Sequence, residues 1–407
     1  MDQPFVIDPT GSDIQAEAAH LRKHGSASRV TLPGGTEAWT ITSHHLIKEL
    51  LKDDRVSKDP RQHYPTWQRG EITPASWLYT WIGVENMFTA YGPDHRRLRK
   101  LIAPAFTVRR TEALAPRIEK ISNQLLDTMA AHPGNQPVDL RAMYAHPLPM
   151  QVICELFGIP EEMHPRTATL IERIFDTTVT PEQAAATWQG IHTVLGELIT
   201  LKRKHPADDM TSVLITTRDD DGTRLSEQEL LYTLLLIIAA GFETTVNLIG
   251  NAVHAVLTHP DQLQLVRTDK ASWDDVIEET LRWAPSIANL PLRYAVDDIA
   301  LPNGQTISKG EAILPAYAAA GRDPEHHGAD ADDFDITRAV QGHLAFGHGV
   351  HLCIGAPLAR LEARIALPAL FKQFPELTLA VTSDRLQPIE SFIANGLRAI
   401  PVTRTPR

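Results

Sequence analysis

The stretch AFGHGVHLCIG, from Ala345 to Gly355, decides the fold. It places Cys353, one of only two cysteines in the chain, among three glycines and just before a helix expected to begin near Pro357. The positive end of a helix and its free backbone N–H groups stabilise a thiolate. Glycines remove side chains near the sulfur, so that something large and flat can approach it. A lone cysteine is more often part of the core, but these surroundings favour a reactive or metal-ligating thiolate, such as a proximal haem ligand.

Composition excludes several classes of protein. The 407 residues are 43% hydrophobic and 22% charged, which is typical of a globular protein with a large core. Two cysteines exclude a disulfide scaffold, a four-cysteine zinc site and an iron–sulfur cluster held by cysteines alone, and they indicate a reducing compartment. The net charge of -11 argues against nucleic acid as the main partner.

The sequence also predicts no membrane partner. The first residues, MDQPFVIDPTGSD, lack the basic and apolar regions of a signal peptide. The longest strongly apolar stretch runs only from Leu230 to Phe242, whereas a spanning helix needs about 20 residues. We therefore expect a cytoplasmic protein.

Periodicity divides the chain into interleaved parts. Residues about 25–60 and 292–318 have short apolar runs and glycine turns, typical of strands, and a Pro-Gly-Gly turn in the first predicts a hairpin. Residues about 92–290 and 357–374 have mostly helical periodicity. No internal repeat or low-complexity linker separates these parts, so residues 1–407 are expected to form a single domain.

One helix is expected to be unusually long. Ser226 and Glu229 make a capping box, with Leu225 as a hydrophobic staple. The helical pattern continues to Thr258, before Pro260 stops it, which corresponds to roughly 50 Å at 1.5 Å per residue. Because its first part is apolar nearly all round, this helix should cross the core.

The middle of this helix carries AAGFETT, residues 239–245. A glycine and two hydroxyl residues weaken the backbone hydrogen bonds and predict a local bulge. In the resulting groove Thr244 could hold water or dioxygen, and Glu243 could relay protons to it. A helix that merely tolerates a glycine is the plain alternative.

These motifs together resemble one known family. FGHGVHLCIG fits the haem-binding signature of cytochrome P450 enzymes, F-x-x-G-x-H-x-C-x-G, at every specified position, and AAGFETT is similar to their oxygen-activation segment. The resemblance extends from MFTAYGP to the C-terminal tail. It implies a mainly α fold with small β-sheets, in which the long central helix crosses a haem b.

The resemblance assigns roles to individual residues. Cys353 would be the axial ligand of the haem iron, and Glu243 and Thr244 would be catalytic. The expected haem contacts are His95, Arg99, Ala240, Arg293, Phe346, His351 and Gly355.

Three further residues are expected to be structural. Glu279 and Arg282 lie at i, i+3 and can pair on one helical face. Similar enzymes bury this pair and complete it with an arginine, here Arg338. One departure from the family is Gly321, which replaces the asparagine that commonly precedes Arg-Asp-Pro.

The segment from Thr73 to Tyr91 is rich in aromatic and aliphatic residues and lies where the family has a lid over the haem. An apolar lid, formed by Trp77 and Leu78 with Met87 and Phe88, implies an apolar substrate. By family position, the substrate pocket should be lined by Met87, Phe88, Phe175, Ala240, Leu290, Leu292 and Phe392, each of which is equally compatible with a core position.

The implied activity is that of a haem-thiolate monooxygenase, which uses O2 and electrons from a ferredoxin and its reductase to hydroxylate an unactivated C–H bond. A steroid is the preferred hydrophobic polycyclic substrate, and a macrolide or another polyketide is the alternative. A peroxide-driven haem enzyme, a non-haem enzyme with a Cys–His nucleophile and a plain binding protein remain as other classes. The surface expected to dock the ferredoxin is basic and comprises Arg96, Arg97, Lys100, Arg109 and Arg110.

Overall fold

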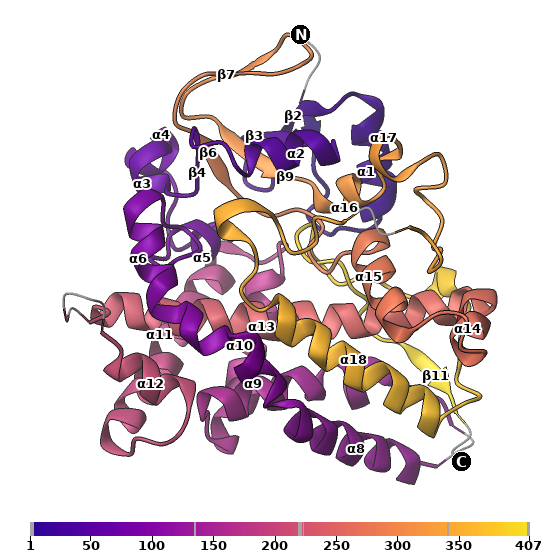
Figure 1. Ribbon diagram of the computed structural model, residues 1–407. Helices are drawn as coiled ribbons and strands as arrows, with labels where there is room; N and C mark the ends of the chain where they lie inside the picture. Colours follow the sequence, from indigo (N-terminus) through magenta and orange to yellow (C-terminus); the bar gives the residue numbers. More distant parts are fainter. Residues whose placement is uncertain (1–3, 134–135, 219–221, 223, 340–341, 405–407) are drawn as a thin grey trace.

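A computed structural model describes residues 4–133, 136–218, 222, 224–339 and 342–404. Its strands gather mostly at one end of the molecule, and its long helices fill the other end (Figure 1). The two parts of the chain predicted to be strand-rich meet in one sheet, because β3 pairs in parallel with β9. The mainly α fold with small β-sheets expected from the sequence is therefore confirmed.

The largest sheet has the strand order β1-β2-β3-β9-β6-β4. The hairpin predicted at the Pro-Gly-Gly turn is formed by β2 and β3, whose antiparallel register runs from Ala27 opposite Ile41 to Leu32 opposite Thr36. Two smaller sheets have the orders β10-β11-β5 and β7-β8. The strands are β1 Phe5–Val6, β2 Ala27–Leu32, β3 Thr36–Ile41, β4 Val56–Ser57, β5 Val138–Asp139, β6 Arg293–Ala295, β7 Ile299–Ala300, β8 Thr306–Ile307, β9 Ala312–Pro315, β10 Thr378–Leu379 and β11 Pro401–Thr403.

Helices make up most of the remaining structure, and α2 lies inside the segment predicted to be strand-rich. They are α1 Ile14–Lys23, α2 His44–Leu50, α3 Pro60–His63, α4 Pro65–Gln68, α5 Tyr79–Ile82, α6 Gly92–Ile102, α7 Val108–Glu112, α8 Ala115–Ala131, α9 Pro147–Phe157, α10 His164–Phe175, α11 Pro181–Lys204, α12 Met210–Thr216, α13 Glu227–Thr258, α14 Pro260–Arg267, α15 Trp273–Trp283, α16 Tyr317–Gly321, α17 Pro324–His327 and α18 Ala356–Gln373. Short 3-10 turns cover Ala103–Phe106, Glu161–Met163, Gly349–His351 and Ser383–Arg385, and one π turn covers Arg141–Ala145.

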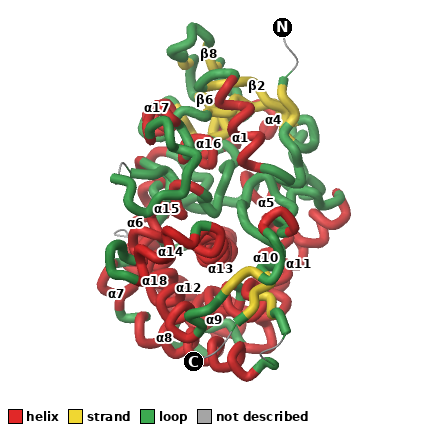
Figure 2. Tube along the Cα trace, turned by 90° about the vertical axis from the view of Figure 1, so that its right-hand side faces the viewer, coloured by secondary structure: helices red, strands yellow, loops and turns green. Residues whose placement is uncertain are grey.

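The long helix α13 begins and ends where the sequence predicts. The Ser226 hydroxyl accepts from the backbone N–H of Glu229, and the Glu229 carboxylate accepts from that of Ser226. The helix runs across the whole molecule in Figure 1, and Figure 2 looks along it near the centre. By length and composition α13 could cross a membrane, but 78% of its most apolar window is buried inside the protein, as in the core helix of a globular fold.

The same helix joins two hydrophobic cores. Leu234 and Ile238 belong to the core beside α9, α10 and the main sheet. Leu248 and Val253, further along, belong to a second core shared with α8, α15 and α18. Groups on the middle turns of α13 are thereby held between the two cores.

Candidate functional site

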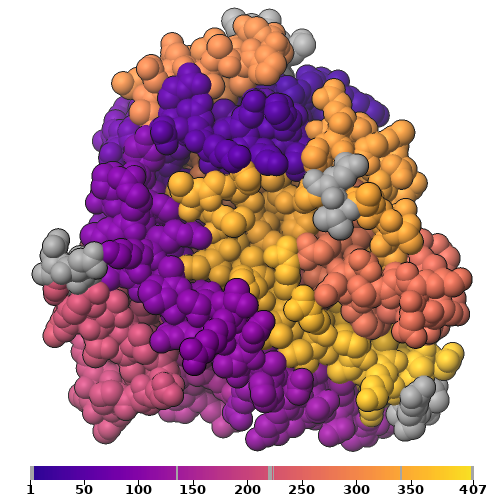
Figure 3. All heavy atoms as spheres, in the orientation of Figure 1, coloured from indigo at the N-terminus to yellow at the C-terminus, as the bar shows by residue number. Residues whose placement is uncertain are grey.

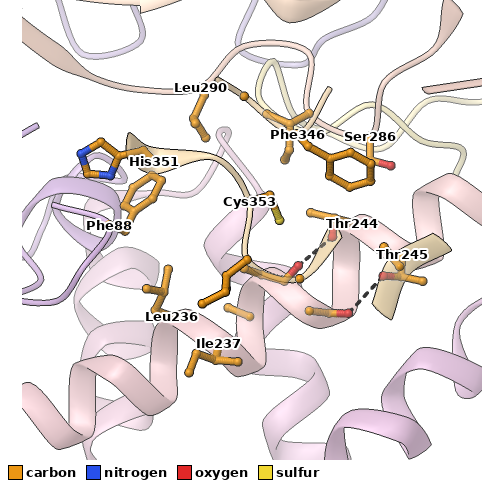
Figure 4. Close-up of a pocket in the computed structure, with 18 of the residues that line it drawn as sticks. Phe88, Leu236, Ile237, Thr244, Thr245, Ser286, Leu290, Phe346, His351 and Cys353 are labelled. Carbon is orange, nitrogen blue, oxygen red and sulfur yellow. Dashed lines mark hydrogen bonds between the residues drawn. The ribbon is translucent and has the colours of Figure 1, made fainter. Parts of the chain in front are cut away.

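A cavity lies between α13 and the loop that precedes α18 (Figure 4). The shape of this loop is fixed by a backbone hydrogen bond, in which the N–H of Cys353 donates to the carbonyl of Phe346 over 2.9 Å. Gly349 has a φ of +70°, and a Cβ there would lie 2.4 Å from the carbonyl oxygen of Leu51. Glycine is therefore required at this position, and the turn presents Cys353 to the cavity.

The thiol of Cys353 lies deep within the protein, and its exposed surface faces the cavity rather than the exterior. Burial raises the pKa of this thiol. Backbone N–H groups of Gly355 and Ala356, together with the nearby Arg99 and Arg360 guanidinium groups, act in the opposite direction. The N-terminal end of α18 and two cations thus partly offset the cost of burying a thiolate, as the sequence suggested.

On the opposite wall, Thr244 lines the cavity and Glu243 does not. The Thr244 hydroxyl donates to the carbonyl of Ala240 over 2.7 Å, and that of Thr245 donates to Gly241 over 3.2 Å (Figure 4). The predicted bulge is wrong, because α13 is a continuous α-helix through this segment and the hydroxyls bond to carbonyls without opening the ladder.

Glu243 is buried on the other side of α13, because successive residues of a helix point about 100° apart. Its carboxylate pairs with Arg141 over 3.0 Å, and one carboxylate oxygen has no hydrogen-bond partner among the described residues. Burial raises the pKa of Glu243, while Arg141 lowers it. The structure therefore does not bring Glu243 to Thr244 in this rotamer.

Arg99 and Arg293 line the cavity together with His351, which Figure 4 shows at one side of it. The rings of His95 and His351 lie 4.1 Å apart, centroid to centroid. Arg99 donates to the carbonyl of Leu352 over 2.8 Å. His95 Nε2 and Arg293 Nε are buried without hydrogen-bond partners in the described part of the chain.

This arrangement fits the haem expected from the sequence. A thiol faces an apolar space, and Arg293, which lines it, has a buried Nε without a hydrogen-bond partner among the described residues, so it could bind a haem propionate. His95 does not line the cavity itself and lies against His351, which does. Phe346 and Gly355 line the space beside the thiol, and Ala240 lines it from α13.

Sequence reasoning missed two charged residues of the cavity, Lys58 and Glu362. Both are buried and neither has a hydrogen bond or an ion pair in the described structure. Burial raises the pKa of Glu362 well above its ordinary value. No motif marks either residue, although SKDP and RLEAR contain unusual charges beside apolar neighbours.

The apolar lining agrees only partly with the expectation. Met87, Phe88, Phe175 and Leu290 line the cavity together with Ala240.

Leu292 and Phe392 do not line it, because both side chains are fully buried in the core. Of the expected lid, Trp77 packs edge-on against Phe392, and Leu78 is also a core residue. Positions not expected from the sequence complete the wall, including Trp81, Ile174, Leu235, Leu236, Ile237 and Ser286.

The three residues expected to be structural meet away from the cavity. Arg282 pairs with Glu279 over 2.7 Å and also donates to the carbonyls of Gly321, Ala331 and Asp333. The Nε of Arg338 lies 3.6 Å from the same Glu279 carboxylate.

The departure at Gly321 has a structural reason. A Cβ at this position would lie 2.1 Å from the carbonyl oxygen of Arg282. The close approach of these two backbones requires glycine in this chain.

The basic residues Arg96, Lys100, Arg109 and Arg110 are exposed. Arg97 differs, because it forms an ion pair with Glu229 at the start of α13. Figure 3 shows the segment around α7 beside the segment that carries the Cys353 loop, on one face of the molecule, and α7 packs against α18.

Known proteins are similar to this chain in sequence and fold. The chain matches the Cytochrome P450 family over residues 19–271 and 273–395. It is 42% identical to 2-hydroxy-5-methyl-1-naphthoate 7-hydroxylase of Streptomyces carzinostaticus over 98% of this chain and 97% of that protein. It is 39% identical to 6-deoxyerythronolide B hydroxylase of Saccharopolyspora erythraea over 90% of each.

Two solved structures are also similar to this chain. CYP154A1 of Streptomyces coelicolor is 50% identical, with a TM-score of 0.94 over 98% of this chain and all of that one. Testosterone-bound CYP154C4 of a Streptomyces species is 42% identical, with a TM-score of 0.96 over all of this chain and 99% of that one.

Proposed function

Because this chain belongs to the cytochrome P450 family, we propose that it hydroxylates an unactivated C–H bond of a polyketide-type natural product. Membership of the family makes the protein a haem-dependent monooxygenase, which uses O2 and requires an electron donor. The observation that carries the proposal is the apolar cavity with Cys353 on one wall and Thr244 on the other. A non-haem enzyme and a plain binding protein are excluded by the family.

When bound, haem supplies the iron chemistry that inserts oxygen into a C–H bond. Cys353 would hold the iron through its sulfur, helped by the N–H groups of Gly355 and Ala356 that oppose the cost of burying a thiolate. Propionate groups would be bound by Arg99, Arg293 and His351, which line the cavity, and by His95 from behind His351. The ring would be contacted by Ala240, Phe346 and Gly355.

Thr244 would position a proton donor in the cavity. Its hydroxyl donates to the Ala240 carbonyl, so its lone pairs are available to accept a hydrogen bond from water. Glu243 would replenish protons only after a change of rotamer that parts it from Arg141. Its raised pKa, caused by burial, makes it easier for this carboxyl group to carry a proton.

The substrate class rests on the cavity and the relatives together. The wall is mostly aliphatic and aromatic, which suits a hydrophobic substrate. One relative is named for a naphthoate and another for 6-deoxyerythronolide B, so the polyketide alternative is favoured over the steroid preferred from the sequence. A steroid is the second candidate, because a neighbour of nearly identical fold holds testosterone.

A ferredoxin with its reductase is the proposed electron donor. Arg96, Arg109 and Arg110 are exposed and are called the basic patch here. Two exposed apolar residues accompany them, since Val108 precedes Arg109 in the sequence and Val350 lies on the Cys353 loop. An acidic electron carrier would be steered to such a surface. We further propose that residues 1–407 form one domain and act in the cytoplasm.

The first test compares the two cysteines. Reduction under carbon monoxide should give the thiolate-type absorption band in wild type and in Cys154→Ser, and Cys353→Ser should lose it. Cys154 is buried, and burial raises its pKa to about 12, so it stays a thiol. Retention of the band in Cys353→Ser would overturn the ligand assignment.

The second test addresses substrate and electron donor. A macrolide aglycone, a hydroxynaphthoate and testosterone are titrated against the haem spin-state change, and products are analysed with a surrogate ferredoxin and reductase or with hydrogen peroxide alone. The proposal expects polyketide binding and ferredoxin-supported product. Product from testosterone alone would establish the second candidate, and product only with peroxide would contradict ferredoxin as the electron donor.

A further inference from the structure

Lys58 follows strand β4 directly and points into the cavity. The residue is 2% exposed. We propose that its ammonium group binds a carboxylate inside the cavity. The inference rests on the proposed function, because that carboxylate belongs either to a haem propionate or to the substrate.

The surroundings of Lys58 stabilise a cation only weakly. Its Nζ has no hydrogen-bond partner among the described residues. It lies 3.4 Å from the centre of the Phe88 ring, a cation–π contact. A ring face offers a fraction of the stabilisation that water gives an ammonium group, so a buried lysine of this kind needs an anion.

The carboxylate nearest to Lys58 in the sequence, that of Asp59, already has other partners. Asp59 caps α3, where it accepts from the backbone N–H of Arg61 and from the side-chain amide of Gln62. It also lies 3.5 Å from the Arg61 guanidinium. Asp59 therefore does not serve as the counter-ion of Lys58.

The cavity itself offers one other carboxylate in its described lining, Glu362 on α18. Burial raises the pKa of Glu362, and neither of its carboxylate oxygens has a hydrogen-bond partner among the described residues. Glu362 therefore does not pair with Lys58. Neither Asp59 nor Glu362 is the counter-ion of Lys58.

The charges that do act on Lys58 are positive. Burial, and then Arg293, lower its pKa well below the ordinary value. The pKa of His351 is lowered well below its ordinary value, first by burial and then by Arg293, His95, Lys58 and Arg99. Lys58, Arg99, Arg293 and His351 therefore form a set of nitrogen donors in the cavity lining, and no described acidic residue pairs with Lys58. Such a set suits one or more bound carboxylates.

Two bound molecules could supply the carboxylate. Lys58 neighbours Arg293 on the side expected to hold the propionates, which suits a propionate. It also contacts Phe88 of the lid, which suits a carboxylate on the substrate, and one relative is named for a naphthoate. The chemistry recognised is the same in both cases.

The experiment uses the holoenzyme of wild type, Lys58→Met, Lys58→Gln and Lys58→Arg, with Lys120→Met on the exposed face of α8 as the matched control. In the first arm, the rate of haem transfer to excess apomyoglobin is measured for enzyme loaded with haem and with haem dimethyl ester. In the second arm, 1-naphthoate and methyl 1-naphthoate are titrated against the haem spectrum.

If Lys58 binds a propionate, both neutral variants lose haem about fivefold or more faster than wild type, and the difference disappears with the dimethyl ester. If it binds the substrate, both neutral variants bind naphthoate about tenfold more weakly, with the methyl ester unchanged. Either result supports the proposal and identifies the source, and Lys58→Arg should retain most of the effect.

The proposal is overturned if both neutral variants match wild type and Lys120→Met in both arms. Lys58 would then be a neutral amine packed on Phe88. Lys58→Gln keeps the test decisive should Lys58→Met fold poorly, as judged by the carbon monoxide spectrum. Failure of the wild type itself to bind haem would instead contradict the proposed function, so the two failures are distinguishable.

Discussion

Cys353 and Cys154 have the same side chain and opposite environments. Cys154 is sealed in the core, and Cys353 sits in a glycine turn with its sulfur on the cavity. The sequence predicts this contrast, because glycines and a following helix mark one cysteine and an apolar helix surrounds the other. Lys58 could not be predicted in the same way, since its burial depends on β4, the lid and β6 meeting in space.

At the same scale, Thr244→Ala should leave haem binding and substrate binding within about twofold of wild type. Product formed per NAD(P)H consumed should fall several-fold, and the missing electrons should appear as hydrogen peroxide. The variant removes a hydroxyl that lines the cavity and whose lone pairs are available to accept a hydrogen bond. Thr245→Ala, which removes the second hydroxyl of the cavity wall, is the comparison. Unchanged coupling in Thr244→Ala would remove Thr244 from proton delivery.

Glu17 gives a pH-dependent prediction. Burial raises its pKa from 4.5 to about 7 although it accepts the N–H of Asp8. Because the folded protein holds this proton more tightly than the unfolded chain, the contribution of Glu17 to stability is full below pH 4.5 and is lost as pH rises through 7.

Glu17→Gln should therefore stabilise the protein at pH 8 by about 1–2 kcal/mol, allowing for partial exposure, and have little effect at pH 4.5. Thermal unfolding at the two pH values, with the exposed Glu37→Gln as control, measures this difference. An equal effect of Glu17→Gln at both pH values would contradict the assignment.

Helices and strands were predicted better than side-chain directions. The limits of α13, the hairpin of β2 and β3 and helix α18 follow from capping, turn and periodicity signals that are local in sequence. Leu292 and Phe392 were wrongly expected in the cavity, because each lies on irregular backbone whose direction is set by distant packing. Glu243 was placed correctly on α13, and its pairing with Arg141 depends on a segment about 100 residues away.

The join between α15 and the segment that follows α17 depends on Arg282. Arg282→Met should lower the free energy of unfolding by about 3–5 kcal/mol, because it leaves Glu279 buried without its main cation and three carbonyls without a donor. Denaturant unfolding measures the change.

The matched control is Arg364→Met, which breaks an exposed pair with Asp274 at 2.7 Å. Such pairs contribute about 0–1 kcal/mol. If both variants lowered the free energy of unfolding equally, the buried Arg282 pair would contribute no more to stability than the exposed Arg364 pair.

At the scale of the whole molecule, the segment around α7 lies beside the segment of the Cys353 loop on one face (Figure 3). The α7 segment carries the exposed Arg109 and Arg110, in a protein whose net charge is -11. Reversal of Arg96, Arg109 and Arg110 to glutamate should slow ferredoxin-supported turnover about tenfold at low salt and weaken its dependence on ionic strength. Arg97 is excluded because it pairs with Glu229.

Substrate titrations of this triple variant should match wild type, since none of the three arginines lines the cavity. Reversal of the exposed Lys270 and Arg385, outside the basic patch, is the control. Equal rates for both variants would show that the patch does not dock the electron carrier.

The apolar length of α13 has a consequence during synthesis. Its second core is completed by α18, whose last residue follows the end of α13 by more than 100 residues. At about 5–20 residues per second, the ribosome exposes α13 for roughly 6–23 s before that partner has emerged. A nascent segment as long and as apolar as a membrane-spanning helix must be shielded from water and from other apolar chains in this interval. Co-expression of a chaperone that holds apolar nascent chains should therefore raise the yield of folded enzyme.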